Sequence, residues 1–274
     1  MLDGCVQPSM SPATNAAAAR VLERLGVDVI QSESVCCGAI DHHLNDTEQA
    51  LEKVRHNIDQ WWPRLEQGAD SVIVTASGCG SMLKDYGHLL VHDDAYREKA
   101  ERIVSHVKDI GEALLEIGSD AILEGTGNGL LNNQAVIEFI NTRCHQIDRD
   151  AAVLAGDNPV KVAFHPPCSL QHGQKMTGQI EKLLTSLGFK LVTFEDAREC
   201  CGSAGTYSIF QPRLSAALKA RKMANIHQAE PDVIATANIG CQLHLQSVSD
   251  RPVIHWIELL DAALPVSMND ATFS

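Results

Sequence analysis

The chain has 274 residues, of which 45% are hydrophobic, and 22 lysines and arginines against 35 aspartates and glutamates give a formal net charge of −13. This acidic balance argues against nucleic acid or an anionic membrane surface as the main partner. No apolar run is long enough for a membrane span, and no signal segment opens the chain, so we expect a cytoplasmic protein that reaches a membrane only through partners. In that compartment, nine cysteines indicate metal or redox chemistry rather than a disulfide framework.

Predicted helices and β-type runs alternate through the first half of the chain. After Cys5, a helix begins at Ser11-Pro12, where serine suits the cap position and proline the first helical position, and Gly26 ends it. The apolar run 27–30 then leads to the turn Cys36-Cys37-Gly38. Three of the nine cysteines therefore lie in this opening segment.

The first half continues with a helix, a strand and a further helix. Asp46 is a suitable cap for an amphipathic helix, which we expect Pro63 to break near its end. The buried-type strand 71–74 then runs into a loop that carries Cys79. Residues 94–117 have the apolar spacing of another helix.

The second half repeats this order, cysteines included. Gly188 ends its first helix 162 residues after Gly26, which identifies an internal repeat. The matching elements are the strand 160–164, Cys168, the β-type run 189–192, the turn Cys200-Cys201-Gly202, the helix from Pro212, the strand 232–235 and Cys241. Only residues 1–4 precede Cys5, so we expect the first repeat to lack its opening strand and the chain to be the C-terminal part of a longer protein.

Strands that alternate with helices in both halves predict an α/β fold with two pseudo-symmetric repeats. Each repeat should be a small parallel sheet flanked by helices, with cysteine-bearing loops at the C-terminal ends of the strands. The expected domains are a first repeat at 1–117, a linker at 118–158, a second repeat at 159–264 and a tail at 265–274. The linker contains a Gly/Asn-rich piece at 125–129, a helix at 134–143 and Cys144, which we interpret as a spare thiol.

Eight of the nine cysteines follow the repeated pattern Cys…Cys-Cys-Gly…Cys, and we expect them to bind metal. The two sets are Cys5, Cys36, Cys37 and Cys79 in the first repeat, and Cys168, Cys200, Cys201 and Cys241 in the second. Four cysteines per repeat is the number that holds an iron–sulfur cluster. Buried structural thiols, a disulfide framework and a zinc site are the alternatives.

The glycine after each cysteine pair has a chemical role in this hypothesis. Two adjacent thiols can reach one metal centre only from a turn, and glycine supplies the positive φ that such a turn often needs. Without a Cβ, it also lets backbone N–H groups approach thiolates. We therefore count Gly38 and Gly202 as cofactor-binding positions.

Three histidines lie close to the cysteines in sequence. His244 follows Cys241 by three residues, on the same face of a helical turn, and could be a cofactor ligand, a proton donor or a surface residue. His165 and His172 bracket Cys168, and we expect them to be hydrogen-bond partners of the site. The sequence has no Gly-x-Ser-x-Gly or His-Glu-x-x-His motif, so we assign no catalytic residue.

The cysteine pattern resembles the cysteine-rich CCG domain of the heterodisulfide reductases and their relatives. These include the iron–sulfur subunits of glycolate oxidase, of lactate oxidation complexes and of anaerobic glycerol-3-phosphate dehydrogenase. The similarity is greatest to the glycolate oxidase iron–sulfur subunits. It rests on Gly4-Cys5-Val6-Gln7-Pro8, Asn57-Ile58-Asp59-Gln60-Trp61-Trp62-Pro63, Thr75-Ala76-Ser77-Gly78-Cys79-Gly80, Leu170-Gln171-His172, Cys200-Cys201-Gly202-Ser203-Ala204-Gly205-Thr206-Tyr207 and Thr236-Ala237-Asn238-Ile239-Gly240-Cys241-Gln242.

The resemblance implies an electron-transfer subunit of an oxidoreductase complex. Flavoprotein subunits would oxidise glycolate to glyoxylate, and electrons would pass through this chain to a quinone or another acceptor. The family's ferredoxin-like region, with its own Cys-x-x-Cys runs, is missing from this chain, so we expect the isolated chain not to be catalytic. Many relatives end each repeat with Cys-x-x-Cys, whereas Met82 and His244 stand at the last position here, which favours an ordinary [4Fe-4S] cluster over the non-cubane type.

Three alternatives stay open at this point. The chain could serve a lactate or other 2-hydroxy-acid dehydrogenase, or a heterodisulfide-reductase-like complex. It could instead be a zinc-stabilised scaffold without a redox role. A thiol–disulfide enzyme that uses Cys200-Cys201 directly is the third.

Overall fold

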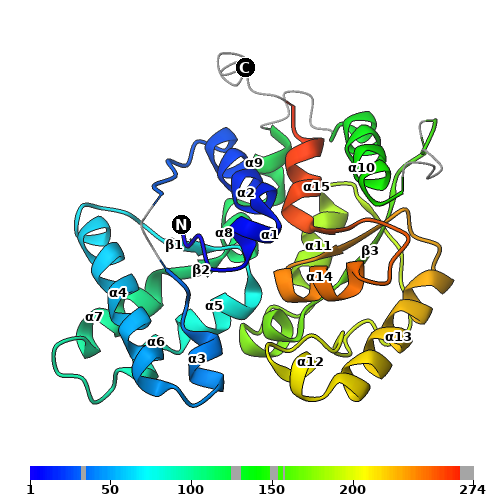
Figure 1. Ribbon diagram of the computed structural model, residues 1–274. Helices are drawn as coiled ribbons and strands as arrows, with labels where there is room; N and C mark the ends of the chain where they lie inside the picture. Colours follow the sequence, from blue (N-terminus) through cyan, green and yellow to red (C-terminus); the bar gives the residue numbers. More distant parts are fainter. Residues whose placement is uncertain (32–34, 125–130, 149–153, 157, 266–274) are drawn as a thin grey trace.

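The computed structural model describes residues 1–31, 35–124, 131–148, 154–156 and 158–265, and its two halves lie side by side (Figure 1). Each half has its own parallel sheet in the described part of the chain. The first sheet has the order β1-β2 and the second the order β4-β3-β5-β6, and every pairing in both is parallel. The predicted α/β fold with two small parallel sheets flanked by helices is confirmed.

The first half contains the elements that the repeat pattern predicts, with additions. They are α1 (Gln7–Met10), α2 (Pro12–Arg24), α3 (Ala39–His43), α4 (Thr47–Glu66), β1 (Val72–Val74), α5 (Ser77–Lys84), α6 (Tyr86–Leu89), α7 (Arg97–His106), β2 (Val107–Asp109) and α8 (Ile110–Ile117). Gly26 follows α2 with a φ of 78°, so the predicted helix end is confirmed. Asp46 caps α4 by accepting a hydrogen bond from the Gln49 N–H group, also as predicted.

Three local predictions in this half are wrong. Residues 94–117 are not one helix, because 107–109 pair with β1 as β2 and a capping box between Asp109 and Glu112 starts a new helix. The run 27–30 forms no strand, since no central strand lies beside it to pair with. Helix α4 continues through Pro63, because a proline in the last turn removes one hydrogen bond while the buried Trp61 and Leu65 hold that turn against the core.

The second half contains the full set of strands. Its elements are β3 (Lys161–His165), the π-helical turn η1 (Ser169–Gly173), α11 (Gln179–Ser186), β4 (Lys190–Leu191), α12 (Tyr207–Phe210), α13 (Pro212–Gln228), β5 (Val233–Thr236), α14 (Ile239–Gln246), β6 (Val253–His255) and α15 (Trp256–Ala263). Strands β3, β4 and β5 lie where the β-type runs predict them. Strand β6 and helix α15 correspond to β2 and α8. Strand β6 pairs with β5 in the same register in which β2 pairs with β1.

The segment between the repeats also contributes helices, α9 (Ser119–Glu124) and α10 (Asn133–Ile147). Helix α10 packs against α15, and its Ile140 and Cys144 are buried in the largest hydrophobic core. Burial raises the pKa of the Cys144 thiol. The glycine-rich piece at 125–129 lies outside the described residues, as does the tail after residue 265.

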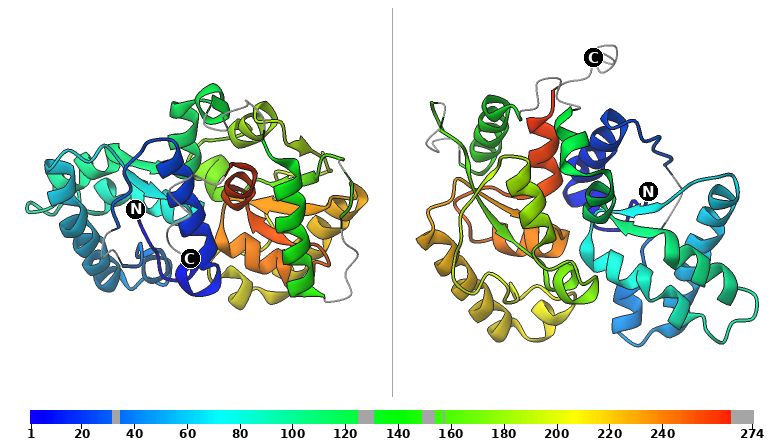
Figure 2. Two further views of the ribbon diagram at one scale, coloured as in Figure 1. Left: turned by 90° about the horizontal axis from the view of Figure 1, so that it is seen from above. Right: turned by 180° about the vertical axis from the view of Figure 1, so that it is seen from behind.

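Helix α2 joins the two halves. It belongs to the first repeat in sequence but packs against α15 of the second, and Figure 2 shows the two helices alongside each other from above. Arg20 and Arg24 both pair with Asp261 on α15, and Thr14 donates a 2.7 Å hydrogen bond to the buried carboxylate of Glu258. This shared packing fixes how the cysteine-bearing ends of the two sheets meet.

Candidate metal centres

The four cysteines of the first repeat come together at one place. Cys5 precedes α1, Cys36-Cys37 precede α3, and Cys79 lies in α5, directly beyond β1. Neighbouring thiols in the order Cys5, Cys36, Cys37, Cys79 lie close enough to shift one another's pKa. Among the described residues, no other cysteine belongs to this group. The exposure of the four side chains differs, from the exposed Cys5 to the buried Cys37.

The second repeat builds the same arrangement. Cys168 follows β3, the pair Cys200-Cys201 lies in the loop after β4, and Cys241 is in α14, directly beyond β5. Neighbouring thiols again shift one another's pKa, in the order Cys168, Cys200, Cys201, Cys241. Here Cys201 and Cys241 are both buried, so the second group is more enclosed than the first. The cysteines lie beyond the C-terminal ends of parallel strands, as the fold class predicts.

The glycine of each Cys-Cys-Gly turn occupies a position where a side chain would clash. Gly38 has a φ of 86° and Gly202 a φ of 93°, values that side chains rarely allow. A Cβ at Gly202 would lie 2.5 Å from the Ser215 carbonyl oxygen, and one at Gly38 would lie 3.1 Å from that of Ala50. In each repeat the next long helix therefore presses its backbone against the turn. The Gly202 N–H group also donates a hydrogen bond to Cys200 Sγ at 3.2 Å.

The thiols shift one another's ionisation. Hydrogen bonds from Cys37 and Cys5 lower the pKa of Cys36 to about 2, and those from Cys168 and Cys201 lower that of Cys200 to about 2. The pKa values of Cys5 and Cys168 are raised, because each thiol donates to the neighbouring thiolate and is partly buried. A cation bound among the thiols would stabilise all of them as thiolates, so both groups have the donor chemistry of a metal or iron–sulfur site.

The histidines near the cysteines differ in burial, which the sequence does not indicate. His172 is exposed, and His244 Nε2 lies 3.3 Å from Ser215 Oγ. His165, the last residue of β3, is only 1% exposed. Within the described chain, its ring nitrogens and the Sγ atoms of Cys201 and Cys241 form the one group of at least three potential ligands whose atoms all lie within 4.8 Å of one another.

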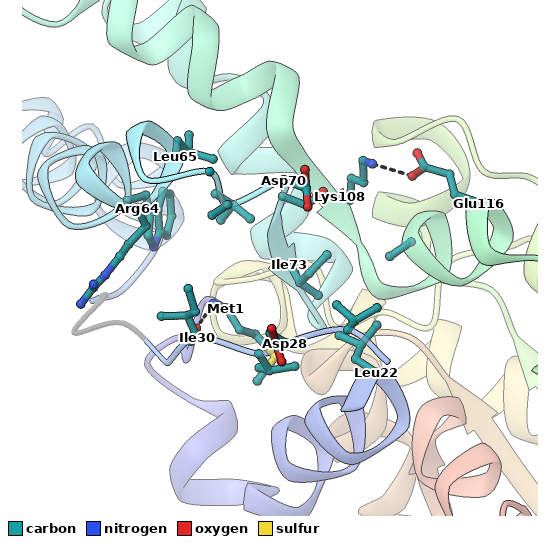
Figure 3. A pocket seen from close by; sticks show the side chains of 18 of the residues that line it. Met1, Leu22, Asp28, Ile30, Arg64, Leu65, Asp70, Ile73, Lys108 and Glu116 are labelled. Atoms are coloured by element: carbon teal, nitrogen blue, oxygen red, sulfur yellow. Dashed lines mark hydrogen bonds and ion pairs between the residues drawn. The ribbon is translucent and has the colours of Figure 1, made fainter. Parts of the chain in front are cut away.

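A large cavity lies apart from both cysteine groups, between residues 27–30 and the start of β1, and Lys108 of β2 also lines it. Its volume is about 760 Å³, and no cysteine is among the described residues that line it. Figure 3 shows Met1 and Ile30 at its edge, where the N-terminal amino group donates to the Ile30 carbonyl oxygen at 2.9 Å. Leu2 N–H donates to the Ile73 carbonyl oxygen of β1, also at 2.9 Å. The cavity thus occupies the position that β3 fills in the second repeat.

Polar side chains connect the two cysteine groups. Ser77 Oγ and Ser169 Oγ lie 2.8 Å apart, and each serine is within two residues of a cysteine of its own repeat. Asn238 accepts a 3.1 Å hydrogen bond from Gly78 N–H in the first repeat, and its Nδ2 lies 3.8 Å from Cys241 Sγ in the second. The two candidate centres therefore face a common interface.

Comparison with known proteins gives the same division of the chain. The cysteine-rich domain family CCG matches residues 1–84 and 162–246, which covers both cysteine groups. The chain is 43% identical, over 96% of its length and 57% of the relative's, to the glycolate oxidase iron-sulfur subunit of Escherichia coli K12. It is 31% identical, over 90% of its length and 49% of the relative's, to a probable glycolate oxidase iron-sulfur subunit of Bacillus subtilis 168.

A second type of relative is similar over nearly its whole length. Lactate utilization protein A of an Exiguobacterium strain is 26% identical, over 94% of both chains. By contrast, the chain spans only about half the length of the two glycolate oxidase relatives. No helix in the described part combines the length and the apolar composition that crossing a bilayer requires.

Proposed function

The chain belongs to the family of cysteine-rich CCG domains, and on that premise we propose that it is the iron–sulfur electron-transfer subunit, or part of it, of a glycolate oxidase (glycolate dehydrogenase) complex. The observation that carries this proposal is the pair of four-thiol groups that meet across one interface. When bound, an iron–sulfur cluster accepts and releases single electrons. The similarity to two glycolate oxidase iron-sulfur subunits supports the choice of complex.

The residues present fit such a cluster. In each repeat, four neighbouring thiols supply the usual number of cluster ligands, and we propose a [4Fe-4S] type. Burial of Cys37, Cys201 and Cys241 keeps water from part of each site, and the Gly202 N–H group supplies a hydrogen bond to a ligand sulfur. Zinc could use the same thiols, so the metal has to be measured.

The chain needs partners for the oxidation itself. Removing two electrons from an alcohol requires a two-electron cofactor such as a flavin, whereas the groups described above suit single-electron transfer. We therefore propose that flavoprotein subunits of the same complex oxidise glycolate to glyoxylate. Electrons then pass through a ferredoxin-like region and this chain to a quinone or another acceptor, in the cytoplasm or at a membrane that the partners bind.

Anaerobic reconstitution with iron and sulfide tests the cofactor. We expect visible absorption typical of iron–sulfur clusters, with iron and sulfide in equal amounts and no glycolate-dependent dye reduction by the chain alone. Activity should return when the flavoprotein subunits and the ferredoxin-like region are added together. Stoichiometric zinc without iron would reject the electron-transfer role and support the scaffold.

A lactate-oxidising complex is the second candidate. The similarity to lactate utilization protein A favours it, because it covers 94% of both chains. The 26% identity is nevertheless well below the 43% identity to the Escherichia coli glycolate oxidase subunit. Because the flavoprotein partner selects the substrate, the reconstituted complex should be assayed with glycolate and with lactate. Dye reduction by lactate alone would change the proposed complex and leave the electron-transfer role in place.

A further inference from the structure

The second cysteine group contains a buried histidine that the protein leaves without a hydrogen bond. His165 is 1% exposed, and neither Nδ1 nor Nε2 has a hydrogen-bond partner among the described residues. An imidazole always has at least one N–H donor, and burying it unpaired is unfavourable. A ligand that His165 can contact would remove this penalty.

The position of the ring indicates what that ligand is. The ring and the Sγ atoms of Cys201 and Cys241 lie within 4.8 Å of one another. Nitrogen and sulfur ligands lie about 2.0 to 2.3 Å from a metal ion such as zinc, so two ligands of one ion are at most about 4.6 Å apart. The three side chains therefore lie close enough together to bind one metal group.

The first repeat has no equivalent donor among its described residues. Leu2 stands three residues before Cys5 and bonds to β1, as His165 stands three residues before Cys168 and pairs with β5. Leu2 is buried and apolar, so its side chain has no atom that can bind a metal. The two centres thus share their cysteine pattern and differ in this one position.

We propose that His165 is a direct ligand of the metal group in the second centre, together with Cys201 and Cys241. The second centre is then a mixed imidazole–thiolate site, whereas the first is held by thiolates alone. Imidazole is neutral where thiolate is negative, and His-ligated iron–sulfur centres have raised reduction potentials. Where His165 takes the place of one thiolate on iron, the second centre accepts an electron more readily than the first, which gives the chain a direction for electron flow. This assignment rests on the proposed iron–sulfur function.

If His165 can bind the metal, loss of one cysteine should affect the two centres differently. With His165 as a ligand, a Cys168→Ala variant still has four donors in the second centre, whereas Cys5→Ala leaves three in the first. We expect the Cys168 variant to keep the iron of its centre after reconstitution and the Cys5 variant to lose it. Equal loss of iron from both variants contradicts the assignment.

The decisive experiment detects the nitrogen itself. The full chain is labelled with ¹⁵N-histidine, its first centre is removed by Cys36→Ala and Cys37→Ala, and the reconstituted and reduced second centre is studied by pulsed EPR. We expect a ¹⁵N coupling typical of metal-bound imidazole. It should disappear in His165→Gln and persist in His172→Gln, the matched control with an exposed histidine on the neighbouring turn.

The possible results separate the two proposals. An iron-loaded centre without histidine coupling, or with a coupling that survives His165→Gln, overturns the assignment and leaves the proposed function standing. This readout on the unsubstituted His165 protein does not depend on whether the His165 variant folds. A chain that takes up no iron at all overturns the proposed function and the assignment with it.

Discussion

Asn238 and Gly78 connect the two repeats at the point where their cysteine groups meet. Gly78 N–H donates to Asn238 Oδ1 at 3.1 Å, although 160 residues separate them in sequence. The same amide reaches Cys241 Sγ with its Nδ2 at 3.8 Å. Because Gly78 directly precedes Cys79, one side chain spans the space between Cys241 Sγ of the second cysteine group and the Cys79 segment of the first.

Removing this amide should change the second centre selectively. Amide N–H groups that bond to ligand sulfur stabilise the more negative, reduced state, so Asn238→Ala should lower the reduction potential of the second centre. The lost hydrogen bonds should cost about 1–2 kcal/mol of unfolding free energy. A potentiometric titration followed by EPR measures the potential. Asn225→Ala is the control, since that amide bonds to Glu195 and Asp196 and to no sulfur; an equal shift in both variants would contradict the prediction.

The turn glycines allow a matched comparison of stability. Gly202 and Gly26 both have positive φ, at 93° and 78°, but only Gly202 has a backbone carbonyl oxygen 2.5 Å from where a Cβ would be. A Cβ on Gly26 would meet no described atom within 4 Å. Gly26→Ala should therefore cost about 1 kcal/mol. Gly202→Ala should cost about 2 kcal/mol or more and reduce the iron bound by the second centre, because α13 must move away.

Unfolding in denaturant and iron analysis of both variants measure these effects. A Gly202 variant that is as stable and as iron-loaded as the Gly26 variant would show that the turn can relax.

Asp109 should make stability fall with rising pH. The carboxyl is fully buried and accepts hydrogen bonds from Gly111 N–H at 2.9 Å and from Gln174 at 3.4 Å, and burial raises its pKa to about 7 from 3.8. The folded protein keeps this proton up to about pH 7, whereas the unfolded chain releases it near pH 3.8. The contribution of Asp109 is therefore complete below pH 3.8 and lost as the pH rises through 7, at no more than about 1.4 kcal/mol per pH unit.

Asp109→Asn removes the titrating proton and keeps an oxygen that can cap α8. The variant should lack the fall in unfolding free energy that Asp109 causes between about pH 4 and pH 7. Denaturant unfolding at several pH values compares the two proteins. His255, whose pKa burial lowers to about 4, adds a slope of opposite sign to both and cancels in their difference. Identical pH profiles would show that Asp109 is ionised in the folded state.

The cavity beside β1 should accept a strand of the kind that the second repeat already has. Met1 and Leu2 bond to both sides of the cavity as the end of a central strand would. A copy of Val160-Lys161-Val162-Ala163 fused in front of Met1 should enter it and pair with β1. We expect a gain in unfolding free energy, because the strand hydrogen bonds and the two buried valines together offset the ordering of four residues.

Thermal or denaturant unfolding measures the gain. The control fusion has proline in place of the second valine, which removes a backbone donor from a central strand. Equal stability of the two fusions would mean that the added segment does not enter the sheet.

The sequence alone determined the features that depend on neighbouring residues. The spacing of the cysteines indicated both four-cysteine groups, and the positive φ of Gly38 and Gly202 follows from glycine's freedom at a turn. The end of α2 and the start of α4 were predicted correctly because caps and helix-ending glycines act over a few residues.

Other features depend on residues far apart in the chain, and only the tertiary structure decided them. Strand β2 exists because β1 lies beside it, since a three-residue run has too little local signal to be told from a helix. Pro63 stays helical because the core holds its neighbours. His165 differs from His172 only in what surrounds each ring, and that environment is built by β3, β5 and two distant cysteines. Burial and long-range contacts, not residue type, place this histidine beside Cys201 and Cys241.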